Sequence, residues 1–522
     1  MAKEKQMMMD LEQGLDPTNK IKYEAVGNVG RCTKGYRGNV GSLAEAFRGP
    51  WAPPNHVTKP SKSKEPKEQE LIEDQTKENE TGSSNMGRWS EGFRGPWDQV
   101  TRVDRGTAQK DSSESAIPGL WSSTLSKEFC CIYRVPNRLR RVNTDAYTPQ
   151  MLLIGPLQHS KKADALELSK TELRYLDYKN REHHKKKYLT DIATIYGDQT
   201  IEEFRRIIKR DEEYIRKSYA ENTEWIISRE FVETILLYSI FILRFFIQTG
   251  TQIFSRKDDI LFKEPCLITT ILEDLVLLEN QLPFVLLEEL FELLQLQTEE
   301  TFRDIVLQIF GFEGKIKKEV KFRHFTELFR LVRVETLGST EELLEKSEKP
   351  RSIKSLHKHN AEKLASAGVD FVNADVENNL SLVINFEEGI LKMPCFVVED
   401  NTERVMRNIM AFEQCHYPFL AFVCNYITFL DFLIDTEQDV DLLFKKGVVK
   451  NWSRRPSSVT EMVNKMCLEI ADHGSNYYNI AESLINYYNN SIHRSLDTLR
   501  RVYFKDLWTG TATPLAPSLS WC

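Results

Sequence analysis

Closely spaced cysteine pairs are missing from this 522-residue sequence. Its nine cysteines are an odd number, and no Cys-x-x-Cys pair occurs among them. Disulfide frameworks and zinc sites need cysteines at close, repeated spacing. We therefore predict free thiols in a reducing compartment and no structural metal.

Long apolar runs are also missing. The most apolar stretch covers residues 231–247 and carries Glu233 and Arg244. A membrane-spanning helix needs about 20 apolar residues with few charges. The N-terminal residues 1–14 have no apolar segment of signal-peptide length. We predict that residues 231–247 form a buried core helix rather than a membrane span.

The charge balance gives no excess of one sign. Lys and Arg total 70 and Asp and Glu total 77, for a net charge of -7. Such a balance predicts no nucleic-acid partner. The densest basic run lies at residues 179–187, where Lys185, Lys186 and Lys187 are candidate interaction residues. It could contact anionic lipid, but a solvated helix face is the favoured interpretation.

Recognisable catalytic and ligand-binding motifs are absent. The segment Gly311-Phe312-Glu313-Gly314-Lys315 has a Gly-Lys pair without the spacing of a phosphate-binding loop. Cys415 and His416 most resemble a nucleophile and its base, but adjacent helical residues point in different directions. We interpret Cys415 as a core residue and His416 as a surface or cap residue. We predict no catalytic, cofactor-binding or metal-binding residue and no cofactor.

The N-terminal extension, residues 1–126, is rich in Gly, Pro, Ser and charge, and we expect it to have little order. It contains an internal repeat, since Phe-Arg-Gly-Pro-Trp occurs at residues 47–51 and again at 93–97. A docking motif used twice would explain the repeat, and so would a duplicated segment without a partner. The candidate interaction residues in the two copies are Phe47, Arg48, Trp51, Phe93, Arg94 and Trp97.

The rest of the chain predicts a mainly α (α+β) fold, a multi-helix globular body with a small antiparallel β insert. Residues 129–340 show helical periodicity, and Pro283 separates a helix ending near Asn280 from the next one. A charged linker follows at 341–360. Residues 361–508 hold short β-prone runs at 369–372, 380–384 and 395–398, and then helical segments. The tail at 509–522 is expected to be unstructured. The predicted helices of this C-terminal part are 403–412, 419–434, 439–446, 459–470 and 477–504.

Several short pieces between residues 131 and 508 carry a family resemblance. They begin with Ile132-Tyr133-Arg134-Val135-Pro136 and Ile154-Gly155-Pro156. They continue with Asp274-Leu275 and with Leu278-Glu279-Asn280-Gln281-Leu282-Pro283-Phe284. Later pieces are Asn408-Ile409, Ala411-Phe412-Glu413-Gln414-Cys415 and, near Trp508, Tyr503-Phe504. In this order the sequence resembles the plant domain of unknown function 247 (DUF247) family.

The resemblance implies a mostly helical plant protein without established catalysis. It also implies a membrane-spanning helix just after Trp508, and some grass relatives are implicated in pollen self-incompatibility. This chain departs from the family pattern after Trp508, where no apolar span follows, and at Tyr238-Ser239-Ile240, which replaces an Asp-Gly-Cys. The extension lies outside the shared region. From the first departure we expect a soluble intracellular protein, and from the second an altered core contact.

These observations together predict a non-enzymatic protein-interaction or recognition module whose protein partner the sequence does not name. Two alternatives stay open. One is an uncharacterised enzyme that uses Cys415 or a histidine, and the other is a peripheral membrane-surface protein held by residues 179–187.

Overall fold

The computed structural model describes residues 119–122, 129–159 and 173–490, with gaps at 252, 255, 257–258, 297, 339–350, 357, 375–379 and 452–454. The predictions for residues 1–118, including both Phe-Arg-Gly-Pro-Trp copies, lie outside the described residues. So does the C-terminal part from residue 491 onward.

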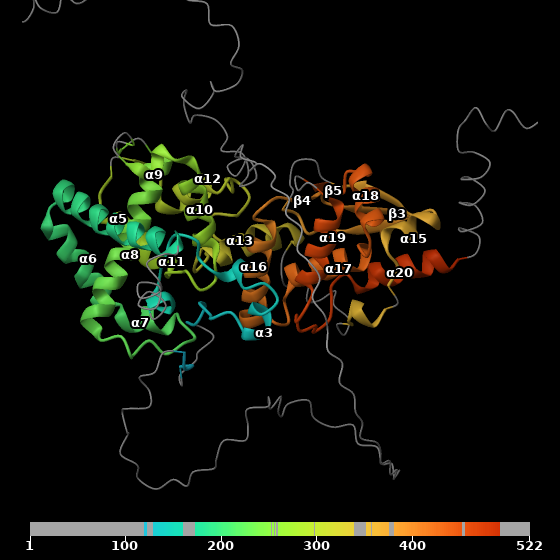
Figure 1. The fold of residues 1–522 in the computed structure, drawn as a ribbon, viewed down its shortest axis with the longest axis horizontal. Coiled ribbons are helices and arrows are strands. Elements are labelled where there is room, and N and C mark those ends of the chain that lie inside the picture. The colour runs from blue at the N-terminus through green and yellow to red at the C-terminus, as the bar shows by residue number, and fades with distance from the viewer. Residues whose placement is uncertain are drawn as a thin grey trace, which may run out of the picture.

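Two lobes form the body, and Figure 1 shows them side by side. The first lobe is helical. It contains α5 (Leu173–Tyr196), α6 (Asp198–Arg210), α7 (Glu212–Lys217), α8 (Ser228–Gly250), α9 (Ile260–Lys263), α10 (Pro265–Val276), α11 (Phe284–Glu292) and α12 (Phe302–Ile309). Among the residues described before these helices, the helical elements are the short α3 (Asn137–Arg140), η2 (Asp145–Tyr147) and η3 (Pro156–Gln158).

Helix α8 is the centre of the first lobe and packs against α5, α6, α11 and α12. Nearly every residue from Phe231 to Gln248 is buried, because the helix is apolar on all sides. The predicted core helix at residues 231–247 is therefore confirmed. Among the described helices, none combines the length and the apolar character required to cross a bilayer.

The second lobe combines helices with two small sheets. Its helical elements are η5 (Ile353–Ser355), α15 (Ala361–Ser366), α17 (Phe422–Leu433), α18 (Glu437–Lys445), α19 (Pro456–Met466) and α20 (Tyr478–Asn489). Its strands are β1 (Asp370–Asn373), β2 (Asn385–Glu387), β3 (Ile390–Met393), β4 (Phe396–Val398) and β5 (Val449–Asn451). Helices α10 and α19 each begin at a proline, which lacks only an N–H that a first helical turn leaves unpaired.

The strand pairing differs from the predicted antiparallel insert. Strands β2 and β3 form an antiparallel hairpin, but β1 pairs with β3 in parallel and β4 pairs with β5 in parallel. The predicted run at 380–384 is not a strand, and strand β3 was not predicted. A parallel pair joins segments far apart in the chain, which local β-propensity cannot reveal.

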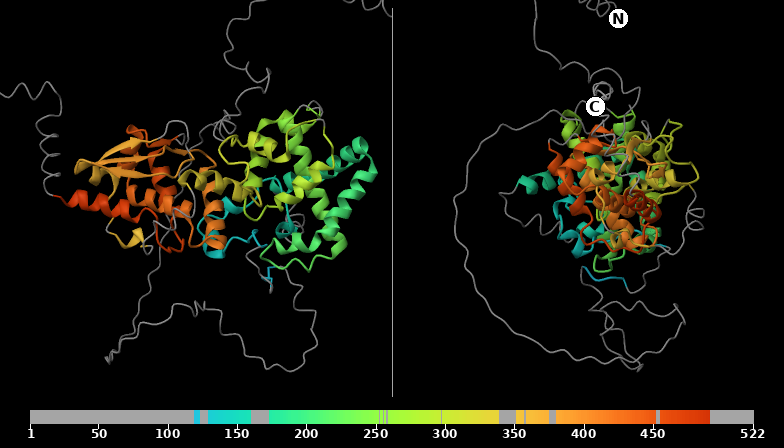
Figure 2. Two further views of the ribbon diagram at one scale, coloured as in Figure 1. Left: turned by 180° about the vertical axis from the view of Figure 1, so that it is seen from behind. Right: turned by 90° about the vertical axis from the view of Figure 1, so that its right-hand side faces the viewer.

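Helices α13 (Phe325–Val334), followed by η4 (Glu335–Leu337), and α16 (Thr402–His416) lie between the lobes in Figure 1 and, seen from behind, in Figure 2. Helix α13 packs on α10, α16 and α17, and α16 also contacts η2 and α19. One cluster of buried apolar side chains extends from Cys131 to Leu484 and includes both lobes. The mainly helical fold class with a small sheet is thus confirmed.

Candidate functional site

Asp274, near the end of α10, is fully buried and binds backbone from the N-terminal part of the body. Its carboxylate accepts hydrogen bonds from the N–H groups of Gln150, Met151 and Leu152 at 2.7–2.8 Å. Arg404 of α16 donates to the same carboxylate at 2.5 Å. Burial raises the pKa of Asp274, and these four donors oppose that rise. The side chain of Asp274 therefore connects residues 150–152, which lie outside helices and strands, to α10 and α16.

The turn after α10 continues this role with three buried polar side chains. Glu279 accepts from Val135 N at 2.9 Å and pairs with Arg140 at 2.5 Å. Asn280 accepts from Ile154 N and donates to the carbonyl of Leu152.

Gln281 accepts from Phe325 N, at the start of α13, and donates to the carbonyls of Leu275 and Leu277. Backbone outside helices and strands lacks regular hydrogen-bond partners. Glu279 supplies such a partner for Val135, and Asn280 supplies partners for Leu152 and Ile154.

Helix α16 carries a second set of buried polar residues. Asn408 accepts from Leu278 N and donates to the carbonyl of Ala146, which joins α16 to both segments. Glu413 accepts from the N–H groups of Val423 and Cys424 and pairs with Arg330 of α13 at 2.9 Å. These polar groups hold neighbouring segments of the body together.

Cys415 and His416 do not form a nucleophile–base pair. The imidazole Nδ1 of His416 lies 2.8 Å from the hydroxyl of Tyr133, and its ring stacks on Phe412. Cys415 packs against the small apolar cluster between α3 and α16, and burial raises the pKa of its thiol to about 12. A protonated thiol is a weak nucleophile. Cys415, predicted to be a core residue, is half-buried and packs at the edge of this cluster.

His324, the N-cap of α13, is fully buried. Its Nε2 lies 2.9 Å from the carbonyl of Cys131 and its Nδ1 accepts from Glu327 N. A carbonyl only accepts, so Nε2 carries the proton and the ring is neutral. Burial lowers the pKa of His324 to about 4.

The depressed pKa of His324 predicts acid destabilisation. An unfolded histidine titrates near about 6.5. Between that pH and about 4 the unfolded chain binds a proton that folded His324 does not, so stability falls as the pH falls. We expect His324→Asn, which keeps a cap acceptor, to flatten urea-derived stability against pH by about 1.4 kcal/mol per pH unit in this window. His183→Asn, at an exposed imidazole, is the control. Equal slopes for wild type and His324→Asn would contradict the assignment.

The basic run at residues 179–187 is not a continuous exposed face. Lys185 is 0 % exposed, because α5 turns this side chain toward α8. Its ammonium donates to the carbonyl of Leu153 at 2.6 Å, pairs with Glu182 and lies 4.3 Å from the ring centre of Tyr238. The prediction of Lys185 as an interaction residue is therefore wrong. Lys186 and Lys187 are exposed, as predicted.

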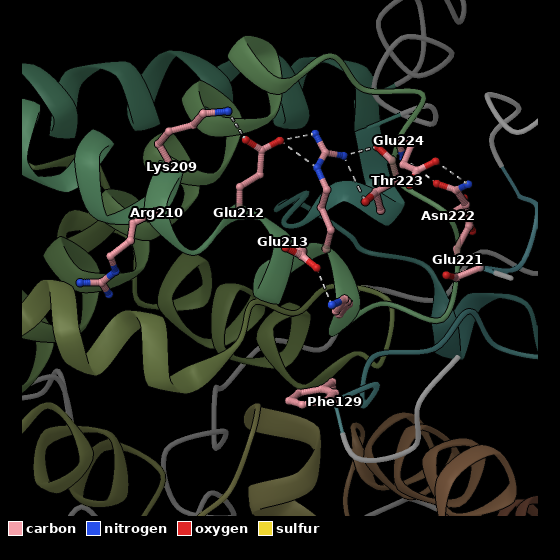
Figure 3. A pocket seen from close by; sticks show the side chains of 12 residues that line it. Phe129, Lys209, Arg210, Glu212, Glu213, Glu221, Asn222, Thr223 and Glu224 are labelled. Atoms are coloured by element: carbon pink, nitrogen blue, oxygen red, sulfur yellow. Dashed lines mark hydrogen bonds and ion pairs between the residues drawn. The ribbon is translucent and has the colours of Figure 1, made fainter. Parts of the chain in front are cut away.

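The largest hollow that we describe lies on the first lobe, beside α6 and α7 (Figure 3). We call it the α7 hollow. It has a volume of about 860 Å³ and is lined by Ser122, Phe129, Lys209, Arg210, Glu212, Glu213, Arg216, Lys217, Glu221, Asn222, Thr223 and Glu224.

Several of the charges in the α7 hollow are paired with one another, while Arg210 pairs with Asp211 and Glu289 and Glu221 pairs with Arg134. Lys209 and Arg216 both contact Glu212 at 2.8 Å, and Lys217 pairs with Glu213 at 2.5 Å. Burial alone would raise the pKa of Glu212, but hydrogen bonds from Lys209, Ser228 and Arg216 lower it to about 2. Glu212 is therefore ionised at neutral pH and cannot act as a general acid.

The rim of the α7 hollow is formed by a short backbone strap, residues 119–122. Ser122 N donates to the carbonyl of Ala220, and Asn222 N donates to the carbonyl of Leu120. On its other side the segment 218–220 pairs with Cys131 and Ile132. The strap thus attaches the end of the N-terminal extension to the first lobe.

Exposed apolar side chains gather at this rim. Trp121 is 77 % exposed. Phe129 lines the α7 hollow and packs edge-on against Tyr214, with ring centres 6.3 Å apart. Exposed aromatic groups beside paired charges are typical of a surface that binds another protein.

The comparisons with known proteins agree with one another. The profile of a plant protein family of unknown function, DUF247, matches residues 132–522. The chain belongs to the DUF247 family. UPF0481 protein At3g47200 of Arabidopsis thaliana is 25 % identical over 425 residues, which cover 76 % of this chain and 83 % of the relative. Another Arabidopsis thaliana relative, UPF0481 protein At3g02645, is 29 % identical over 23 % of this chain and 22 % of its own length. No solved structure matches the chain.

The pieces that carry the DUF247 resemblance coincide with the buried polar residues described above. Asp274, Glu279, Asn280, Asn408 and Glu413 all bind backbone or an arginine inside the body. The pieces of sequence that carry the family resemblance therefore supply buried polar side chains that hold segments of the body together. We call these five residues and their arginine partners the clamp. Tyr238 of α8 lies with its ring centre 4.3 Å from the Lys185 ammonium.

Sequence reasoning did not find the surface around the α7 hollow. Trp121 and Phe129 lie near the start of the described chain, where no periodicity marks them. Backbone pairing with residues 220–222 places Trp121 beside the hollow, and a ring contact with Tyr214 places Phe129 on α7. The apolar cluster Gly119-Leu120-Trp121 was the one local signal.

Proposed function

We propose that this DUF247 protein is a non-enzymatic interaction module and that the α7 hollow with its aromatic rim binds a protein partner. The observation that carries the proposal is the exposure of Trp121, whose backbone pairs with Glu221 of the hollow, together with Phe129, which lines the hollow and packs on Tyr214. Exposed aromatic side chains supply most of the binding energy at protein interfaces. The implication of grass relatives in self-incompatibility supports recognition as the broader role.

The enzyme alternative has weaker support in the described residues. The thiol of Cys415 is protonated at neutral pH, and His416 contacts Tyr133. The alternative of a membrane-surface protein is also weaker, because Lys185 is buried and does not belong to an exposed basic face.

The test is a quantitative pull-down from plant tissue with the full chain and the double variant Trp121→Ser, Phe129→Ser. We expect the double variant to lose the specific partners by about tenfold or more, because two aromatic anchors are removed. The control is Phe419→Ser, which removes an equally exposed aromatic side chain, 79 % exposed, from the other lobe. Circular dichroism should show both variants folded.

A third arm deletes residues 1–118 and leaves the strap in place. Loss of partners only in this arm would move recognition to the extension and to its Phe-Arg-Gly-Pro-Trp copies. Identical partner lists for all arms would contradict the proposed function.

A further inference from the structure

The N-terminal extension joins the body at the α7 hollow itself. The N–H of Gly119 donates to the Glu221 carboxylate at 2.8 Å, and Asn222 N donates to the carbonyl of Leu120. Glu221 and Asn222 both line the hollow. The chain that precedes Gly119 is therefore connected to the edge of the hollow, and a segment a short distance before Gly119 is held near this surface.

The second Phe-Arg-Gly-Pro-Trp copy, residues 93–97, lies a short distance before Gly119 in the chain. Trp97 precedes Gly119 by 22 residues, and a connection of that length spans up to roughly 70 Å when it is fully extended. The first copy ends at Trp51, 68 residues before Gly119. The effective concentration of a tethered group falls roughly as the −3/2 power of the connecting length, so it is about fivefold higher for the second copy.

The α7 hollow offers aromatic surface to this copy. Phe129 lines the hollow, and the exposed Trp121 lies at its rim. Aromatic side chains pack favourably on one another in edge-on or offset arrangements. The volume of about 860 Å³ lies within the range of about 300–1,000 Å³ that is common for ligand pockets. The hollow therefore has room for the two aromatic side chains of the copy.

The α7 hollow also offers a carboxylate to Arg94. Glu224 lines the hollow and is exposed, and no ion pair to Glu224 is found in the part of the chain that the structure describes. The side-chain amide of Asn222 lies 3.5 Å from its carboxylate. Figure 3 shows Glu224 and Phe129 well apart among the lining residues. A segment that carries an arginine between two aromatic side chains thus has a partner for each kind of group at this surface.

We propose that residues 93–97 dock in the α7 hollow of their own chain, where Phe93 and Trp97 pack on the aromatic rim and Arg94 pairs with Glu224. A docked copy covers the surface that the proposed partner uses, so the partner binds only the fraction of molecules in which the copy is displaced. This competition rests on the proposed function, whereas the docking itself does not.

The first test uses the full chain with Phe93→p-benzoylphenylalanine, a photoreactive analogue of phenylalanine. After irradiation of dilute purified protein, we expect mass spectrometry to find cross-links to peptides that contain residues 121–129 or 209–224. The yield of these cross-links should not depend on protein concentration. Cross-links distributed over both lobes would overturn the proposal. So would a yield that rises with protein concentration, because it would place the copy on a second chain.

Three further chains make this test specific. Phe47→p-benzoylphenylalanine places the same group in the first copy and should give about fivefold fewer cross-links to the hollow, because its connection is longer. Adding Trp97→Ser to the Phe93 analogue should lower the yield by about tenfold, since one aromatic anchor is lost. Trp89→Ser, at an aromatic residue outside the repeated pentapeptide, is the control and should leave the yield unchanged. Equal yields from the two copies, or equal losses with Trp97→Ser and Trp89→Ser, would overturn the proposal.

The second test measures the competition. In the pull-down from plant tissue, the double variant Phe93→Ser, Trp97→Ser should raise the capture of partners that require Trp121 and Phe129 by about threefold or more, because the hollow is free in every molecule. Unchanged capture would overturn the competition. Cross-links without any partner that depends on Trp121 and Phe129 would support the docking and contradict the proposed function. Such a partner without cross-links would support the proposed function and contradict the docking.

Discussion

Asp274→Ala is expected to destabilise the body by about 3–5 kcal/mol, because it leaves the Arg404 guanidinium buried without its partner. Three backbone N–H groups at residues 150–152 lose their acceptor at the same time. This loss is a large part of the roughly 5–15 kcal/mol that stabilises a typical domain. Urea unfolding followed by circular dichroism measures it. Limited proteolysis should show faster cleavage near residues 143–154 before global unfolding.

Two further variants distinguish the effect of losing the Asp274–Arg404 ion pair from the effect of removing side-chain volume at residue 274. Arg404→Met alone should destabilise strongly, whereas the double variant with Asp274→Ala should lose less than the sum of the single changes, because neither charge is left alone. Asp370→Ala is the surface control. Its pair with Lys446 is half-exposed, and such pairs contribute less than about 1 kcal/mol. Additive single effects, or a loss of under about 1 kcal/mol for Asp274→Ala, would show that the clamp is not important.

Gly155→Ala is the second change with a large expected effect. Gly155 has a φ of +80°, and a Cβ atom there would lie 2.6 Å from the backbone carbonyl oxygen of Gln281. The left-handed conformation costs an alanine about 1–2 kcal/mol. The clash adds about 1–3 kcal/mol, because the buried backbone at residue 155 or at Gln281 has to move. Chemical denaturation should therefore show a loss of about 2–5 kcal/mol.

Gly197→Ala is the matched control for Gly155→Ala. Gly197 has a φ of +87°, but nothing lies within 4 Å of the Cβ position. It should therefore show the conformational loss alone, about 1–2 kcal/mol. Similar losses of stability in Gly155→Ala and Gly197→Ala would mean that residues 154–156 are not in close steric contact with the turn at Gln281.

The sequence predicted the elements whose cause is local. Pro283 separates α10 from α11, although α10 ends at Val276 and not near Asn280, and the apolar residues 231–247 lie in the buried helix α8. Adjacent residues on a helix face different ways, which argued against a pair of Cys415 with His416, and Cys415 packs at the edge of an apolar cluster. Each of these predictions needs only a few neighbouring residues.

The features that depend on distant partners could not be predicted. From the sequence alone, Lys185 looks like a surface lysine. Its burial depends on two distant contacts of its ammonium, with the ring of Tyr238 in α8 and with the carbonyl of Leu153. Strand β3 is too short for its alternation to stand out, and its neighbour β1 comes from the far side of a crossover. The α7 hollow likewise forms only when residues 119–122 pair with residues 220–222.

The clamp also determines the order in which the chain can fold during synthesis. Asn408 and Arg404 bind the carbonyls of Ala146 and Thr148, which lie 262 and 256 residues earlier. At ordinary translation rates a gap of this length takes roughly 13–50 s to synthesise. Arg404 also follows its partner Asp274 by 130 residues. Until α16 is synthesised, the nascent first lobe therefore lacks the guanidinium that pairs with the buried Asp274 carboxylate, although Asp274, Glu279 and Asn280 can already bind residues 135–154.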